Sequence, residues 1–316
     1  MNTSVPRYRT LSAWLKGFFG EPVWKISIDA GLGCPNRNPA LGLEGCIFCN
    51  PNGSGTGALS QGLSVAQQID QGITFLRQRY GTKKFIGYFQ SFTNTYGSLK
   101  QLQTLYREAL CRPEVVALAI GTRPDCVTDE TLDLLRELSK DRFLWIEYGL
   151  QSIHDHTLNI IRRGHTAHDF FDAVNRTKVR GIPVVAHLIL GLPGETIEDM
   201  VATARAVANE RIQGVKLHPL YIIQGTELAR MYARGEYTPL TEENCIDAIL
   251  AVLKVLPPEM VIHRITSDPH PHELVAPTWM LDRRQTRRNL MEAMERVGLE
   301  QGSLFDGKCS EAEKCV

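Results

Sequence analysis

Short apolar runs alternate with amphipathic stretches along most of the chain. Hydrophobic residues at helical spacing predict helices at about 64–80, 98–111, 128–139, 166–180 and 196–210. Six runs rich in β-branched and aromatic residues predict strands at 23–28, 84–89, 115–121, 143–149, 183–191 and 214–223. Strands that alternate with helices pair in parallel through right-handed crossovers. The pattern therefore predicts an α/β fold, either a barrel or an open doubly wound sheet.

The two ends of the chain depart from this rhythm. Residues 11–19 carry five large apolar side chains at helical offsets, which favours a packed amphipathic helix over a surface membrane anchor. Beyond residue 224, a helix at about 240–255 and a last strand at 260–265 precede a Pro/His-rich loop, a basic helix and a tail. We therefore expect an N-terminal helical segment (1–20), a principal barrel domain (21–265) and a C-terminal loop, basic helix and tail (266–316).

The composition is that of a soluble globular protein. Hydrophobic residues make up 43% of the 316 residues and charged residues 22%. No apolar run approaches the roughly 18 residues that a membrane span requires, and the N-terminus has no signal-peptide pattern, so we expect a cytoplasmic protein without a membrane partner. The formal net charge is zero, which argues against a strongly basic nucleic-acid surface over the whole chain and leaves a local patch open.

Three cysteines are the most informative residues. Cys34, Cys46 and Cys49 lie in "GCPNRNPALGLEGCIFCN", directly after the first predicted strand, where active sites of barrels lie. Three thiolates are one short of a structural zinc site and of a four-cysteine iron–sulfur cluster. Either a distant residue supplies a fourth ligand, or one metal position is open to a substrate. On spacing alone, a zinc knuckle and scattered buried cysteines remain alternatives.

This loop resembles the cluster loop of the radical S-adenosylmethionine (SAM) superfamily. In that superfamily three cysteines hold a 4Fe–4S cluster, and SAM binds the fourth iron through its amino and carboxylate groups. The usual spacing is C-x3-C-x2-C, whereas the first gap here is eleven residues. The segments "CPNRN", "GCIFCN", "GTRPDC", "YGLQS", "RRGHT", "HLILGLPGET" and "KLHPL" resemble, in this order, the YhcC-like radical SAM family, whose cluster loop has the longer gap. They resemble more distantly the radical SAM domain of the Elongator catalytic subunit, which acts on wobble uridines of tRNA.

The resemblance implies a fold, two cofactors and a chemistry. The fold would be a partial (βα)6 TIM-like barrel of radical SAM type with an N-terminal helix and a C-terminal helical extension. Cys34, Cys46 and Cys49 would hold the 4Fe–4S cluster. The enzyme would cleave SAM to a 5′-deoxyadenosyl radical, with electrons from a donor such as flavodoxin or ferredoxin. No residue is assigned as catalytic, and the bond that is broken stays open.

Candidate contacts to SAM lie where the predicted strands end. Gln90 follows the second strand, at the place where relatives bind the methionine amine with a Gly-Gly-Glu motif that is absent here. Arg123 either engages the carboxylate of SAM or pairs with Asp125. Glu147 stands in an apolar run, with Gln151 four residues on, and an ionised carboxylate there needs a partner. Glu147 either binds ribose hydroxyls or an amine, or forms a salt bridge with a barrel lysine or arginine.

Three further candidates follow along the chain. Gly191 belongs to the turn that resembles the segment flanking the adenine of SAM. His187 and Lys216 stand inside predicted strands, and each is either a contact of a bound molecule or a satisfied core residue. Lys216 in a strand interior would need a partner such as Glu147.

Three functions are compatible with the sequence. The first is a radical SAM enzyme acting on RNA, with tRNA as the expected partner; besides the Elongator likeness it rests on Arg283, Arg284, Arg287 and Arg288, although such charge runs often only face solvent. The second is a radical SAM enzyme acting on a small molecule or a peptide. The third is a non-enzymatic zinc-binding protein. Cys309 and Cys315 stand in the tail, which we expect to be disordered.

Overall fold

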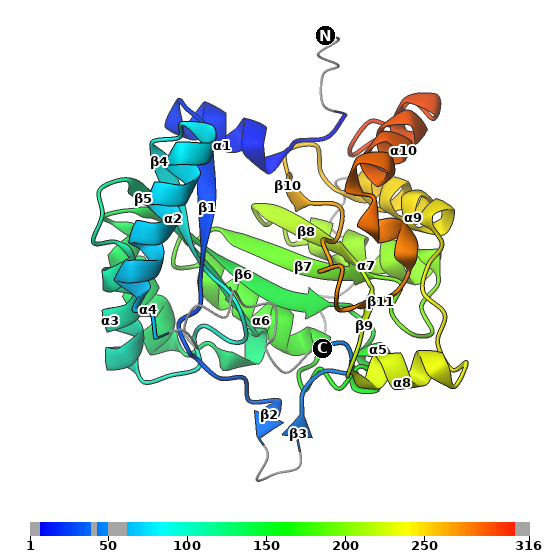
Figure 1. The fold of residues 1–316 in the computed structure, drawn as a ribbon, viewed down its shortest axis with the longest axis horizontal. Coiled ribbons are helices and arrows are strands. Elements are labelled where there is room, and N and C mark those ends of the chain that lie inside the picture. The colour runs from blue at the N-terminus through cyan, green and yellow to red at the C-terminus, as the bar shows by residue number, and fades with distance from the viewer. Residues whose placement is uncertain (1–6, 39–42, 50–61, 307–316) are drawn as a thin grey trace.

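A curled, fully parallel sheet forms the centre of the molecule (Figure 1). The computed structural model describes residues 7–38, 43–49 and 62–306. Within them the sheet has seven strands, and every pair of neighbours is parallel. In spatial order the strands are β1 (Val23–Ile28), β4 (Lys84–Phe89), β5 (Val115–Thr122), β6 (Phe143–Gln151), β7 (Val184–Leu190), β8 (Gly214–Pro219) and β10 (Val261–Arg264).

Helices cover the outer face of this sheet. Each of them begins at a serine or threonine whose side chain accepts a hydrogen bond from a backbone N–H of the first turn. Their apolar faces and the outward-facing residues of the strands form the largest core cluster. These helices are α2 (Val65–Tyr80), α3 (Leu99–Ala109), α4 (Asp129–Ser139), α6 (Ala167–Lys178), α7 (Ile197–Asn209) and α9 (Glu242–Val255).

The helix α1 (Leu11–Phe19) packs at the end of the sheet where the strands begin. Leu15 is buried with Ile86 and Trp145, whose side chains face the inside of the curled sheet, and Phe143 at the start of β6 packs beside them. The expected packed amphipathic helix is confirmed. None of the helices in the described ranges combines the length and the apolar character that crossing a membrane requires.

The C-terminal part returns to the open edge of the sheet (Figure 1). After β10 the chain forms β11 (Leu274–Ala276), a 3-10 turn η4 (Thr278–Leu281) and the basic helix α10 (Arg283–Arg296), which packs on α9. The predicted partial barrel with an N-terminal helix and a C-terminal helical extension is confirmed. The proposed domain boundaries stay a prediction, and Cys309 and Cys315 lie outside the described residues.

The predicted strand at 214–223 is wrong beyond Pro219. Proline lacks the N–H that a further ladder hydrogen bond would need, and the chain turns there. The remaining β9 (Ile222–Ile223) pairs antiparallel with β11, which lies in the segment that the sequence predicted as a loop. Two short helices were also missed, α5 (Asp155–Ile160) and α8 (Glu227–Ala233).

Candidate functional site

The cysteine loop follows β1 and contains a small hairpin. β2 (Arg37–Asn38) pairs antiparallel with β3 (Leu43–Glu44), with Arg37 opposite Glu44. Because paired residues of antiparallel strands lie about 5 Å apart, the hairpin brings the segments of Cys34 and Cys46 back together at its base. The eleven-residue gap between the first two cysteines is therefore a hairpin insertion.

The three thiols lie near one another, but in the described structure they are not gathered at metal-binding distances. The backbone N–H of Cys49 donates to the Cys46 carbonyl at 3.0 Å, which closes the turn between them. Burial raises the pKa of the Cys49 thiol, Arg37 opposes that shift, and the neighbouring thiols of Cys46 and Cys34 add to it. Across the ranges that the structure describes, no group of three or more His, Cys, Asp or Glu side chains is gathered at metal-binding distances. The donor set nevertheless suits an iron–sulfur cluster, which takes cysteine thiolates as its ligands.

Cys46 also receives one donor from its own loop and one from the segment after α5. Asn36 Nδ2 lies 3.6 Å and Arg163 Nη1 3.7 Å from its Sγ. Asn36 donates to the carbonyls of Arg162 and Arg163 as well, at 2.8 and 2.7 Å, which ties the cysteine loop to the "RRGHT" segment. Arg163 also donates to the Gly149 carbonyl at 2.9 Å. Arg163 was not predicted as a site residue, because an arginine just after a short helix gives no local signal in the sequence for a contact to sulfur.

Three loops meet beside the cysteines. The N–H of Thr93, after β4, donates to the carbonyl of Gly33 in the cysteine loop, and the N–H of Asn94 donates to Gly121 at the end of β5, both at 3.2 Å. Non-glycine residues with positive φ mark the same end of the sheet, at Phe92 (57°) and Gln151 (75°). Such backbone strain concentrates at functional sites.

Arg123 pairs with Asp125, which is one of the two roles that the sequence left open, and its contact with the carboxylate of SAM stays a prediction. Its Nε and Nη2 donate to the carboxylate of Asp125 at 2.9 and 2.6 Å, and Nη2 also reaches the Gly164 carbonyl at 2.9 Å. Its Nη1 is buried and has no hydrogen-bond partner in the described structure. The Oγ of Ser91 and the Oγ1 of Thr93 are also buried and have no hydrogen-bond partner in the described structure. Buried donors are rarely left unpaired, so this end of the sheet suits a polar ligand.

Glu147 lies at the centre of a buried network inside the barrel. Its Oε2 accepts from His187 Nε2 at 2.7 Å and from Lys216 Nζ at 3.2 Å. Its Oε1 accepts from Trp145 Nε1 at 2.9 Å and from Lys25 Nζ at 3.3 Å. The expected partnership of Lys216 with Glu147 is confirmed, and so is the salt-bridge interpretation of Glu147. Its role toward ribose hydroxyls or an amine stays a prediction.

Burial and the two lysines set the ionisation of this network. Burial raises the pKa of Glu147, but the charges of Lys216 and Lys25 outweigh it and hold that pKa well below its usual range. Burial lowers the pKa of Lys216 to about 7 against the pull of Glu147, and burial lowers the pKa of His187 to about 4. A neutral His187 must donate from Nε2 to the carboxylate, which leaves its Nδ1 as an acceptor.

The remaining predicted residues lie at the ends of their strands. Gln90 follows β4 and is half-buried, and Gln151 ends β6 and is buried. Gly191 follows β7 with φ of +83°, its carbonyl accepts from Tyr237 Oη at 2.7 Å, and a Cβ there would lie 2.8 Å from Leu240. The strand ends therefore bring Gln90, Arg123, Gln151 and Gly191 to the same edge as the cysteines, while Glu147, His187 and Lys216 lie deeper inside.

Comparison with known proteins gives two matches along the sequence. The pattern of the Radical SAM superfamily matches residues 31–207, and that of the Radical_SAM C-terminal domain matches residues 212–296. The protein YhcC of Escherichia coli is 34% identical over 84% of this chain and 85% of its own length. A tRNA uridine(34) acetyltransferase of Methanocaldococcus infernus is 34% identical over 54% of this chain, which spans 32% of that enzyme.

A solved structure shows the same fold. The structure of Methanocaldococcus infernus Elp3 with an N-terminal deletion superposes with a TM-score of 0.69 at 21% identity, over 88% of this chain and 64% of that one.

Proposed function

The chain belongs to the radical SAM superfamily, and from this premise we propose that it modifies RNA, with tRNA as the substrate. The family predicted from the sequence is confirmed, and with it the YhcC-like relationship. The chain is therefore an enzyme of a class that binds a 4Fe–4S cluster and SAM, and the alternative of a non-enzymatic zinc-binding protein is set aside. Its reaction is unassigned.

Cys34, Cys46 and Cys49 are the proposed ligands of the cluster. Their support is the hairpin that returns Cys46 toward Cys34 and the two donors, Asn36 and Arg163, that reach the Cys46 sulfur. Hydrogen bonds to cluster sulfurs are one of the means by which a protein sets a cluster's potential. A cluster held by these three cysteines would supply the one-electron reduction of the SAM sulfonium from which the radical chemistry of the superfamily starts. We propose flavodoxin or ferredoxin as the electron donor.

The loops after β4, β5 and β6 are the proposed SAM contacts. The single observation that carries this assignment is the buried Arg123, which keeps one Nη1 donor unpaired although Asp125 fixes the rest of its guanidinium. A guanidinium held in this way is preorganised for a carboxylate. Ser91 and Thr93 add two unpaired hydroxyls, and Gln90 and Gln151 add amides at the same edge. Gly191, after β7, is the proposed neighbour of the adenine.

The choice of RNA rests on sequence similarity and on the basic helix. The enzyme of Methanocaldococcus infernus that matches half of this chain is named for its action on a tRNA uridine. Because this chain spans about one third of that enzyme, we carry over the substrate class and not the acetyl transfer. The exposed arginines at the start of α10 support an RNA partner through phosphate contacts.

An anaerobic assay tests the proposal. The reconstituted protein is incubated with dithionite and SAM, and 5′-deoxyadenosine is quantified with and without bulk tRNA, against a Cys34→Ala, Cys46→Ala, Cys49→Ala triple variant. Stimulation by tRNA and a new nucleoside in its digest are the expected results. Stimulation by an RNA-free pool of small metabolites instead would assign the enzyme to the small-molecule class and overturn the RNA proposal.

A further inference from the structure

A cavity opens on the flank of the barrel, and no residue of the cysteine loop lines it among the described residues. It has a volume of about 630 Å³ and lies between β1 and β10, the two edge strands of the sheet, with walls from α1, α9, η4 and α10. This volume is within the range of ordinary small-molecule sites. The side chains of Lys25 and His263 line it and also reach toward Glu147, at 3.3 and 3.7 Å from Oε1. The flank cavity thus adjoins the buried network.

Positive charge dominates the lining of the flank cavity. Lys25, Arg264, Arg283 and Arg287 line it, and Asp268 is the one acidic residue among the described lining residues. Asp268 already forms an ion pair with Arg283. Within the described part of the chain, Arg264 and Arg287 form no ion pair. This net positive charge favours the binding of an anion in the flank cavity.

The backbone of β10 is irregular at Arg264, whose exposed side chain lines the cavity. The pairing register of β10 against β8 shifts between Ile262 and Arg264, so that Arg264 stands opposite Lys216. A bulge of this kind re-aims a side chain that regular alternation would turn to the other face. Lys216 and Lys25 already share the single carboxylate of Glu147, so Arg264 adds a cation that this carboxylate does not offset.

Another part of the wall is apolar and aromatic. It is lined by Leu11 from α1, Ile246 and Ile249 from α9, and Trp279 from η4. Cations beside aromatic and aliphatic surface are the combination that single-stranded nucleic-acid sites use, with the cations on phosphates and the apolar surface on bases.

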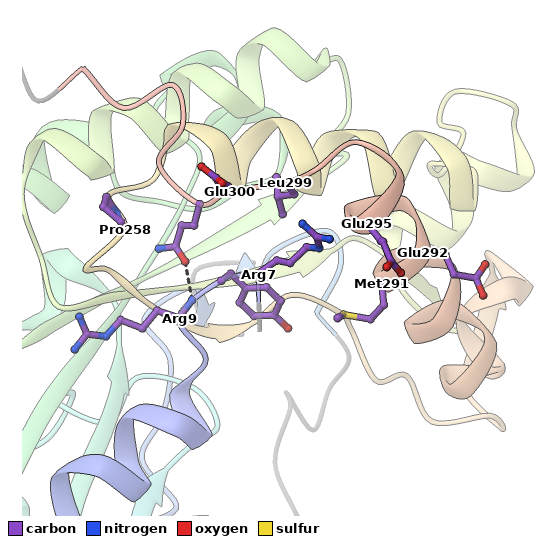
Figure 2. Close-up of a pocket in the computed structure, with 10 residues that line it drawn as sticks. Arg7, Arg9, Pro258, Met291, Glu292, Glu295, Leu299 and Glu300 are labelled. Carbon is purple, nitrogen blue, oxygen red and sulfur yellow. Dashed lines mark hydrogen bonds between the residues drawn. The ribbon is translucent and has the colours of Figure 1, made fainter. Parts of the chain in front are cut away.

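The neighbouring cavity in Figure 2 lacks this character. It has a volume of about 750 Å³ and lies between the segment of Arg7 and Arg9 and the far half of α10. Glu292, Glu295 and Glu300 line it, and these three carboxylates outnumber its two arginines. We therefore expect an anion to bind in the flank cavity and not in this one.

We propose that the flank cavity binds a phosphate group of the substrate together with its attached nucleoside, through Lys25, Arg264 and Arg287. This inference rests on the proposed function in one respect, because it takes the phosphate to be that of an RNA strand. The same chemistry would admit a phosphorylated small molecule, and the experiment distinguishes the two sources.

The helix α10 offers a matched control. Arg283 and Arg287 are one helical turn apart and line the cavity, whereas Arg284 and Arg288 are not among its lining residues. All four are exposed, so replacing one by alanine, a strong helix former, leaves the fold intact. Arg287→Ala therefore tests the cavity, and Arg284→Ala tests the general basic character of the helix.

Equilibrium binding to the full-length, cluster-reconstituted protein is measured with AMP and with a single-stranded RNA of about 12 nucleotides. We expect Arg287→Ala to weaken RNA binding about tenfold, the loss of one charge-assisted contact, and Arg284→Ala to weaken it far less. Lys25→Met, checked for an unchanged melting temperature, should also weaken it. AMP binding with the same variant pattern but without RNA binding would support the phosphate site and overturn the RNA function. RNA binding that both arginine variants weaken equally, or no binding of either probe, would overturn the inference.

Discussion

Lys216 Nζ lies 3.2 Å from Glu147 Oε2 across the inside of the curled sheet, with β7 between their two strands. Both side chains are almost fully buried, and Lys216 also donates to Tyr88 Oη at 2.7 Å. Lys25 and His187 approach the same carboxylate from β1 and β7. One buried carboxylate therefore joins β1, β6, β7 and β8, and its removal would leave the buried Lys216 and the half-buried Lys25 without a counter-charge.

We expect Glu147→Gln to destabilise the fold strongly. Removing one partner of a buried ion pair leaves an uncompensated charge, at a cost of about 3–5 kcal/mol. Urea denaturation of both proteins gives the free energy of unfolding and therefore measures this loss of stability. Glu137→Gln is the control, because Glu137 pairs with Lys140 at the surface and such pairs contribute about 0–1 kcal/mol. Equal effects of the two variants would contradict the central role of Glu147.

Arg123→Lys should weaken SAM binding about tenfold without loss of iron. A lysine keeps the charge near Asp125 but cannot present a second donor from a fixed planar group. Isothermal titration of SAM and iron analysis of the reconstituted variant measure the two effects. Arg112→Lys is matched to it, since Arg112 makes the same two-bond contact with Asp70 at a site away from the strand ends. A weakened SAM affinity in both variants, or in neither, would argue against the assignment of Arg123.

Much of the fold could be predicted because strand pairing follows a regular hydrophobic pattern. The strands at 23–28 and 84–89 have the predicted bounds, since both are bordered by polar turns. The short elements β9, β11 and α8 could not be predicted, because elements of two, three and seven residues carry too little periodicity and depend on tertiary partners.

Some residues and contacts of the candidate site could be predicted from the sequence, and others could not. Cysteine spacing and the flanking segments pointed to Cys34, Cys46 and Cys49. The partner of Lys216 could be inferred from the cost of a buried charge. The approach of Lys25 and His263 to the carboxylate of Glu147 could not be predicted. It depends on the curl of the sheet and on a bulge in β10, and no local sequence pattern indicates either.

Gly149→Ala should disturb the contact of Arg163 with Cys46. A Cβ at this position would lie 2.4 Å from Arg163 Nη2 and 2.6 Å from Gln151 Nε2, so the guanidinium would have to move. We expect lower iron content after reconstitution and a loss of stability of about 1–3 kcal/mol. Gly17→Ala in α1 is the control, because no atom lies within 4 Å of its added Cβ and alanine favours the helix. Iron content equal in both variants would contradict the expected displacement.

Stability should fall as the pH drops from about 6.5 toward 4. Burial lowers the pKa of His187 and of His263 to about 4, and burial lowers the pKa of His218 well below its usual value. In that window the unfolded chain binds protons that the folded chain does not, so acid favours unfolding, by about 1 kcal/mol per imidazole near pH 5.5. Urea denaturation at pH 7.5 and 5.5 measures the difference. His218→Asn lacks one of the three imidazoles, so its free energy of unfolding should change less between the two pH values, by the uptake of about one proton fewer on unfolding. The same change as in the unsubstituted protein would mean that His218 does not take up a proton on unfolding.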